Sequence, residues 1–218
     1  MTPDYDRAAT KAAETLIRFN VCTAPVNPMR ILKAMKGVVM VSFSEMSESM
    51  GIKRQELLDR FRESQDAATS VLVENGKKSY IVIYNQKLSE YMLQKALARE
   101  MGHIVLGHDG TLPYEIRHEE AKCFAMHLLT PRALIHSLQA ACVRITTEVI
   151  GHLTGCNERC MGCMRSFPEV RVPAKLNRQI RDNFMDYILN FFEYQRILAV
   201  DDGTALADLG NYMKGYEE

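Results

Sequence analysis

The sequence lacks an excess of charge of either sign, since 27 Lys and Arg residues balance 27 Asp and Glu residues. A neutral chain produces no general field that would draw nucleic acid or a membrane surface. The sequence also lacks an apolar run of 18 residues, so we expect no transmembrane helix. Its first residues, MTPDYDRAATKAAE, include acidic groups and no apolar segment of the kind found in signal peptides. These absences predict a cytoplasmic protein.

Cysteine is present in modest number, and a cytoplasmic location favours thiols or metal ligands over disulfides. Four soft ligands lie within twelve residues and could hold a second zinc ion: His152, Cys156, Cys160 and Cys163. The segment 157–166 also has a helical pattern, so simple burial and a redox role stay open for these cysteines. The remaining three, Cys22, Cys123 and Cys142, are expected to lie in the core.

The order of the expected elements predicts an α+β fold with a small, mostly antiparallel sheet packed by helices. Residues 69–85 read as a β-hairpin, because β-branched runs flank Asn75-Gly76, a dipeptide that tolerates positive φ. VVMVSF, residues 38–43, reads as a buried strand. Helices are expected to start at Thr2-Pro3-Asp4 and to cover 28–37, 47–63, 89–107, 117–129, 132–142, 146–153 and 174–199.

We expect three regions along the chain. Residues 1–140 form a zincin-like domain, residues 141–200 form a helical C-terminal extension with the cysteine cluster, and residues 201–218 form an acidic, flexible tail. We find no internal repeat and no low-complexity linker.

One helix carries a carboxylate where its apolar face should be. In ALAREMGHIVLGHDG, residues 96–110, Glu100 falls in the middle of the stripe that packs inward, and His103 lies on its flank. A buried carboxylate is costly without a partner. The next helix brings Glu120 to the edge of its own apolar stripe, so we expect Glu100, His103 and Glu120 to share one pocket. E-x-x-H alone also occurs by chance, and an ordinary hydrogen-bonded histidine is the simpler interpretation.

Two linked motifs resemble the ImmA/IrrE family of zincin-like metallo-endopeptidases. The family pattern is a helix with H-E-L-G-H followed by E-A-x-x-F-A-x-x-L-L-x-P, and this chain has AREMGH and then HEEAKCFAMHLLTP. The resemblance implies Glu100 as general base, with His103 and Glu120 as second and third zinc ligands. It also implies a protein of bacterial or phage origin that acts on a helix-turn-helix repressor, without direct DNA contact by this chain.

The chain departs from the family at the first zinc ligand, where it has Arg99. A guanidinium has no lone pair to donate and repels a dication. We expect Arg99 to pair with Glu100 or Glu120 and so to supply the charge that zinc would provide. Zinc-dependent hydrolysis would then be impaired or lost.

Two alternatives stay open. One is an active zinc endopeptidase with a substitute ligand, for which the remaining histidines are the candidates, although their geometry is not predictable: His108, His118, His127, His136 and His152. The other is a DNA-binding or metal-binding regulatory module at residues 146–166, which have a faint helix-turn-helix pattern.

Overall fold

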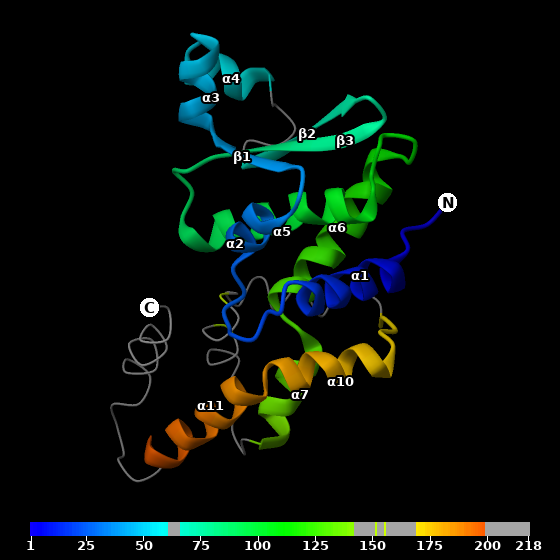
Figure 1. The fold of residues 1–218 in the computed structure, drawn as a ribbon, viewed down its shortest axis with the longest axis vertical. Helices are drawn as coiled ribbons and strands as arrows, with labels where there is room; N and C mark the ends of the chain where they lie inside the picture. The colour runs from blue at the N-terminus through cyan, green and yellow to red at the C-terminus, as the bar shows by residue number, and fades with distance from the viewer. Residues whose placement is uncertain (61–65, 142–150, 152–154, 156–168, 199–218) are drawn as a thin grey trace.

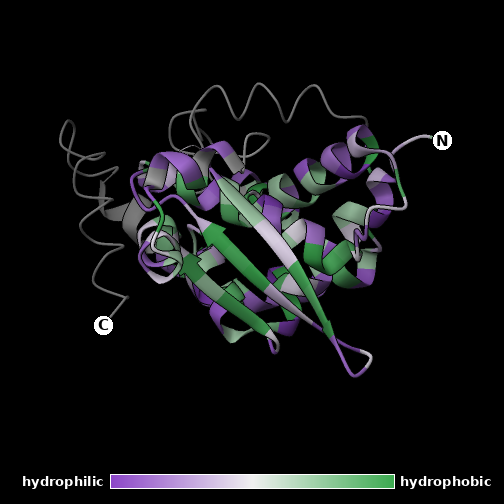
Figure 2. Ribbon diagram, turned by 90° about the horizontal axis from the view of Figure 1, so that it is seen from above, coloured by the Kyte–Doolittle hydropathy of each residue, from purple (hydrophilic) through white to green (hydrophobic). Residues whose placement is uncertain are grey.

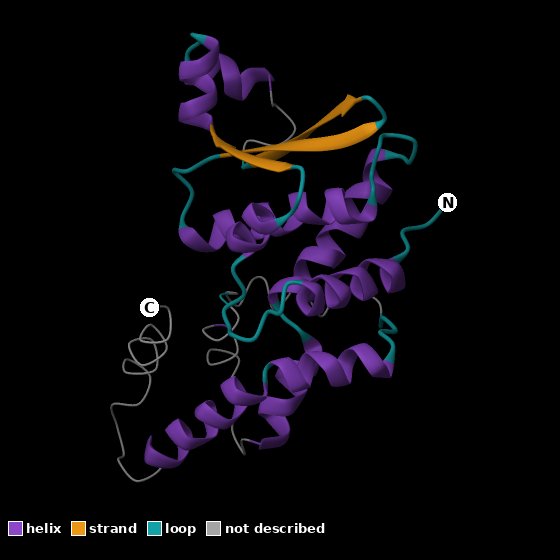
Figure 3. Cartoon of the chain, viewed as in Figure 1, coloured by secondary structure: helices purple, strands orange, loops and turns teal. Residues whose placement is uncertain are grey.

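The computed structural model describes residues 1–60, 66–141, 151, 155 and 169–198 of the chain. These residues form a small sheet with helices on both of its sides (Figures 1 and 3). In chain order the elements are α1 (Tyr5–Arg18), α2 (Pro28–Ala34), β1 (Val38–Ser42), α3 (Phe43–Met50), α4 (Arg54–Arg60), β2 (Ala67–Glu74), β3 (Lys77–Tyr84), α5 (Glu90–Leu106), α6 (Tyr114–Leu129), α7 (Arg132–Ala141), α10 (Ala174–Asn183) and α11 (Met185–Leu198).

The sheet has the strand order β1-β3-β2. β2 and β3 form the predicted antiparallel hairpin, in which Asn75 and Gly76 have φ values of 50° and 72°. Positive φ at both positions suits a two-residue hairpin turn. β1 runs parallel to β3, with Val38 opposite Tyr80. The sheet is therefore mixed, and the α+β class is confirmed.

The two faces of the sheet are covered by different helices. α3 and α4 lie on one side, and α5 packs against β2 and β3 on the other (Figure 1). Successive side chains of a strand point to opposite faces. Accordingly, buried Ile83 joins a small cluster with Phe43 and Leu57, whereas buried Val82 joins the large core.

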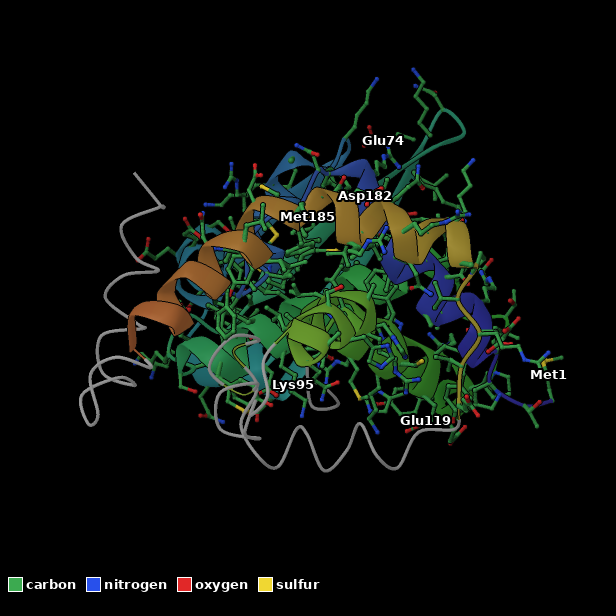
Figure 4. The ribbon with its side chains drawn as sticks, turned by 90° about the horizontal axis from the view of Figure 1, so that it is seen from below. Met1, Glu74, Lys95, Glu119, Asp182 and Met185 are labelled. Carbon is green, nitrogen blue, oxygen red and sulfur yellow. The ribbon has the colours of Figure 1, made fainter. Side chains whose placement is uncertain are left out.

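The large core lies below the sheet and extends through the helical layers. It joins α1, α5, α6, α7, α10 and α11, and α10 packs against both α1 and α7. Figure 4 shows side chains made mostly of carbon between these helices. Fully buried members include Leu16, Leu97, Phe124, Leu134 and Phe184. The division of the chain at residue 140 stays a prediction.

Several expected helix bounds are wrong: α2 ends at Ala34 and α6 begins at Tyr114, and three further differences have identifiable reasons. α1 begins after Asp4, which caps the helix by accepting from the Arg7 N–H, so Thr2 is not the cap. The helix expected at 47–63 is two helices, because Gly51 with φ of 63° ends α3. The helix expected at 174–199 is likewise interrupted at Phe184.

The sheet is less buried than the sequence suggests. Val39 of β1 is 55% exposed, although a buried strand was expected there. Three consecutive residues of β2, Val71, Leu72 and Val73, are 42, 41 and 63% exposed. Figure 2 shows apolar colour along the strands, which run out to the projecting hairpin. Within the described residues, none of the helices combines the length and apolar character that a membrane crossing needs.

Candidate functional site

The candidate site lies where α5 crosses α6. A Cβ atom on Gly102 of α5 would lie 3.1 Å from both the Ala121 carbonyl oxygen and the Phe124 ring. Such a contact is tighter than most Cβ contacts, so glycine at this position favours the close approach of the two backbones. The crossing buries Glu100 of α5 and Glu120 of α6, which are 4% and 3% exposed.

Glu100 is held by its sequence neighbour and by the sheet. Arg99 donates from Nη2 to Glu100 Oε1 at 3.3 Å, and the Thr69 hydroxyl of β2 donates to Oε2 at 2.9 Å. Burial raises the pKa of Glu100 above its usual value, and the charge of Arg99 and the Thr69 hydrogen bonds offset part of this rise. Of the two pairings expected for Arg99, the structure has the one with Glu100.

Glu120 is held by the start of α1 and by a loop. The Asp4 backbone N–H donates to Glu120 Oε1 at 2.9 Å, and Arg7 Nη1 lies 3.7 Å from Oε2. The N-terminus of a helix carries partial positive charge, so α1 stabilises this carboxylate in two ways. Glu119, beside it in the sequence, instead lies toward the outside (Figure 4) and pairs with Lys122.

A histidine lies between His103 and Glu120. His108 Nδ1 is 2.9 Å from His103 Nδ1, and His108 Nε2 is 3.0 Å from Glu120 Oε2. Gly107, with φ of 69°, ends α5 and turns the chain so that the His108 side chain is only 2% exposed. Burial, assisted by the nearby His108 and Arg99, lowers the pKa of His103 to about 3. Burial also lowers the pKa of His108, against the opposing effect of Glu120.

This arrangement does not fit a zinc ion at the motif residues. A catalytic zinc needs three protein ligands whose donor atoms all lie about 2.0–2.2 Å from one point. Position 99 offers no lone pair, and an imidazole separates His103 from Glu120. Among the described residues, no group of three His, Cys, Asp or Glu side chains is placed to hold a metal ion.

Few of the partners of these residues can be predicted from the sequence. His108 was a candidate substitute ligand, but its contact with both His103 and Glu120 was not foreseen. Asp4, Arg7 and Thr69 were not expected at the site, because nothing in a pattern along one helix signals a contact with α1 or β2. Glu100 and Thr69 are 31 positions apart, and Glu120 and Asp4 are 116 apart.

The other histidines within the described residues lie outside the chain of His103, His108 and Glu120, although His118 is near enough for its charge to lower the pKa of His103. The His118 ring stacks on Tyr114. His127 is buried, and burial lowers its pKa to about 4. His136 is exposed on α7.

The cysteines are only partly described. The predicted second metal site, His152, Cys156, Cys160 and Cys163, lies outside the described residues, as do Cys142 and most of the 146–166 segment. Cys123 is buried as expected, and its thiol donates to the Tyr5 carbonyl oxygen. Cys22 is exposed in the loop after α1, so its expected place in the core is wrong.

Comparison with known protein families shows which family this part of the chain resembles. Residues 52–153 match the IrrE N-terminal-like domain family, Peptidase_M78. This segment is an IrrE N-terminal-like domain. The resemblance to ImmA/IrrE metallopeptidases is thereby confirmed. Neither a curated protein nor a solved structure matches the chain with significance.

The IrrE-like domain contains Arg99, Glu100, His103 and Glu120 but not every group that contacts them. Thr69 and His108 belong to the matched segment, whereas Asp4 and Arg7 precede it. Glu120 therefore depends on a helix outside the matched domain.

Proposed function

We propose that this ImmA/IrrE-like protein has lost zinc-dependent peptide hydrolysis at the motif site and acts by binding a transcriptional regulator. The observation that carries the proposal is the ion pair between Arg99 Nη2 and Glu100 Oε1, at 3.3 Å. It joins the residue at the first ligand position to the residue that the resemblance makes the general base.

Charge supports this proposal. At roughly 5 Å and an effective dielectric constant of about 20, a guanidinium and a dication repel each other by about 6 to 7 kcal/mol. Moreover, a carboxylate held by a guanidinium is a poorer base for a water molecule, since the ion pair favours its charged form. Arg99 thus weakens both metal binding and proton transfer.

The sheet offers a surface on which a regulator could bind. Among the described strands, β2 has a neighbour on one side only, and its Val71, Leu72 and Val73 are partly exposed. An extended segment can add to such an edge through backbone hydrogen bonds. Thr69, on the same strand, contacts Glu100, so a bound segment would run past the former catalytic position. The resemblance indicates a helix-turn-helix repressor as the partner.

The second candidate function is a zinc endopeptidase with His108 as a substitute ligand. What favours it is the position of His108, whose ring nitrogens lie within 3.0 Å of both His103 and Glu120. Under this alternative, zinc would displace the two hydrogen bonds and recruit the same three side chains.

Metal content and cleavage separate the two functions. The protein would be purified without chelators, its zinc measured by mass spectrometry, and a helix-turn-helix repressor incubated with it and analysed by intact mass. We expect less than 0.1 zinc ion per chain at the motif site, an estimate that follows from the repulsion above, and an uncut repressor that binds in calorimetry. Because the cysteine cluster could itself take zinc, His152→Ala/Cys156→Ala serves as the control. Stoichiometric zinc in this control, together with cleavage, would overturn the proposal.

A further inference from the structure

Three hydrogen-bonded groups, His103, His108 and Glu120, form a chain whose proton positions can be deduced. Glu120 pairs with Arg7 and accepts from the Asp4 N–H, so it is a carboxylate and can only accept from His108 Nε2. In a neutral imidazole that carries its proton on Nε2, Nδ1 accepts, and His103 then donates from Nδ1.

The contact between the Nδ1 atoms of His103 and His108 fixes the direction in which His103 can bind a cation. The remaining lone pair of His103 is on Nε2, and the two nitrogens of an imidazole point away from each other. Nδ1 faces His108, which leads on to Glu120. Nε2 therefore faces away from Glu120, and one zinc ion could reach both residues only if His108 left its place between them.

Glu120 is also fully engaged on its other side. Its Oε1 accepts from the Asp4 N–H at 2.9 Å, and the Arg7 guanidinium lies near Oε2. A zinc ion would have to replace charge-assisted hydrogen bonds that are already formed within a buried site. The side chains of Glu120 and His108 are 4% and 2% exposed, so little water is available to compensate for bonds that are broken.

We infer that His108 is a second determinant of the metal-free site, independent of Arg99: by joining His103 to Glu120 it keeps zinc out even when position 99 is histidine. The inference rests on the proposed function and deepens it. Restoration of H-E-x-x-H alone would leave the second and third ligands bound to His108 and to α1.

Zinc titration of two variants of the full chain tests this inference. Arg99→His restores the missing ligand, and Arg99→His/His108→Ala also removes the imidazole between the other two. Zinc(II) affinity is measured by competition with a chromophoric chelator, in the background of His152→Ala/Cys156→Ala. We expect the double variant to bind at least tenfold more tightly than Arg99→His, equal to about 1.4 kcal/mol. Arg99→His/His136→Ala, which removes an exposed imidazole, is the matched control and should bind like Arg99→His.

Equal affinity of Arg99→His and the double variant would overturn the inference, and weaker binding by the double variant would show that His108 is a ligand. Neither result depends on whether the unmodified protein carries zinc, which is the test of the proposed function.

Nitrogen NMR of the unmodified protein provides a second measurement that needs no substitution. Long-range correlation of the imidazole nitrogens should show His103 protonated at Nδ1 and bare at Nε2, and His108 protonated at Nε2. His103 with its proton on Nε2 would contradict the proposed chain of hydrogen bonds.

Discussion

Glu100 and Glu120 are two buried carboxylates on crossing helices, and the molecule neutralises them in different ways. Glu100 relies on the residue beside it, Arg99, and on a hydroxyl from β2. Glu120 relies on the first turn of α1 and on His108, which follows α5. The cation that neutralises Glu100 is its neighbour in the sequence, whereas the groups of α1 that neutralise Glu120 are more than a hundred residues away from it.

Under the proposed loss of zinc, the difference explains how the fold could be kept without the metal. Zinc would neutralise both carboxylates at once, so its loss leaves two separate charges to stabilise. The Arg99 guanidinium pairs with Glu100. The second charge needs a second source, and α1, which lies outside the IrrE-like segment, provides it.

The largest effect should follow from breaking the local pair at Glu100. Arg99→Met leaves a carboxylate that is 4% exposed without its cation, and we expect the free energy of unfolding to fall by about 2 to 3 kcal/mol. The value is below that of a fully buried pair because the Arg99 side chain is 21% exposed. Urea unfolding at pH 7 measures it.

The matched variant is Arg99→Met/Glu100→Gln, which removes both charges but keeps an acceptor for Thr69. It should recover most of the lost stability, since an uncharged pair leaves no ion unpaired. If Arg99→Met alone lowered stability by less than about 0.5 kcal/mol, a typical surface effect, the local compensation would not be needed.

The sequence predicted Glu100 and its surroundings better than it predicted Glu120. A carboxylate at the centre of an apolar stripe had to be buried, and Arg99 beside it was the nearest cation. Likewise Asn75-Gly76 predicted the hairpin, because few dipeptides tolerate that turn. These are local relations, and they depend on residues a few positions apart.

The partners of Glu120 were not predictable in this way. The direction of the chain after α5 depends on Gly107, whose positive φ returns His108 to the site. The contact with Arg7 depends on how α1 packs on α6, which is a property of the whole core. A pattern along one helix contains neither kind of information.

Acid should change the contributions of His103 and Glu100 to the free energy of unfolding in opposite directions. The pKa of His103 is about 3 in the folded protein against 6.5 as its ordinary value. The unfolded chain therefore binds more protons, so the contribution of His103 is fully present above pH 6.5 and is lost as the pH falls toward 3. Glu100 has a raised pKa, so its burial costs most at neutral pH and less as the pH falls toward its ordinary value.

Stability measured by urea unfolding from pH 7 to pH 4 separates these effects. His103→Gln should flatten the loss of stability in acid. Glu100→Gln should make that loss steeper, because it removes a carboxyl group whose burial costs less as the pH falls. His136→Gln, at an exposed position of α7, is the control. The same slope in the unmodified protein and in His103→Gln would mean that His103 is not kept neutral by burial.

The smallest effect should come from Arg7, although it too places a guanidinium beside a buried carboxylate. Its Nη1 lies 3.7 Å from Glu120 Oε2, and its side chain is 43% exposed. Solvent screens such a pair, and Glu120 keeps the Asp4 N–H and His108 when Arg7 is removed. We expect Arg7→Ala to lower the free energy of unfolding by about 0.5 to 1 kcal/mol.

Part of that loss should come from the end of α5, because Arg7 also donates to the Leu106 carbonyl oxygen in its last turn. Lys11→Ala, which breaks the exposed pair with Glu14 on the same helix, gives the baseline for a surface cation of α1. The two sites differ as described only if the loss of unfolding free energy in Arg7→Ala lies between the losses in Lys11→Ala and in Arg99→Met. A loss as large as that of Arg99→Met would mean that Glu120 depends on one guanidinium as Glu100 does, and that the hydrogen bonds from Asp4 and His108 contribute little to its neutralisation.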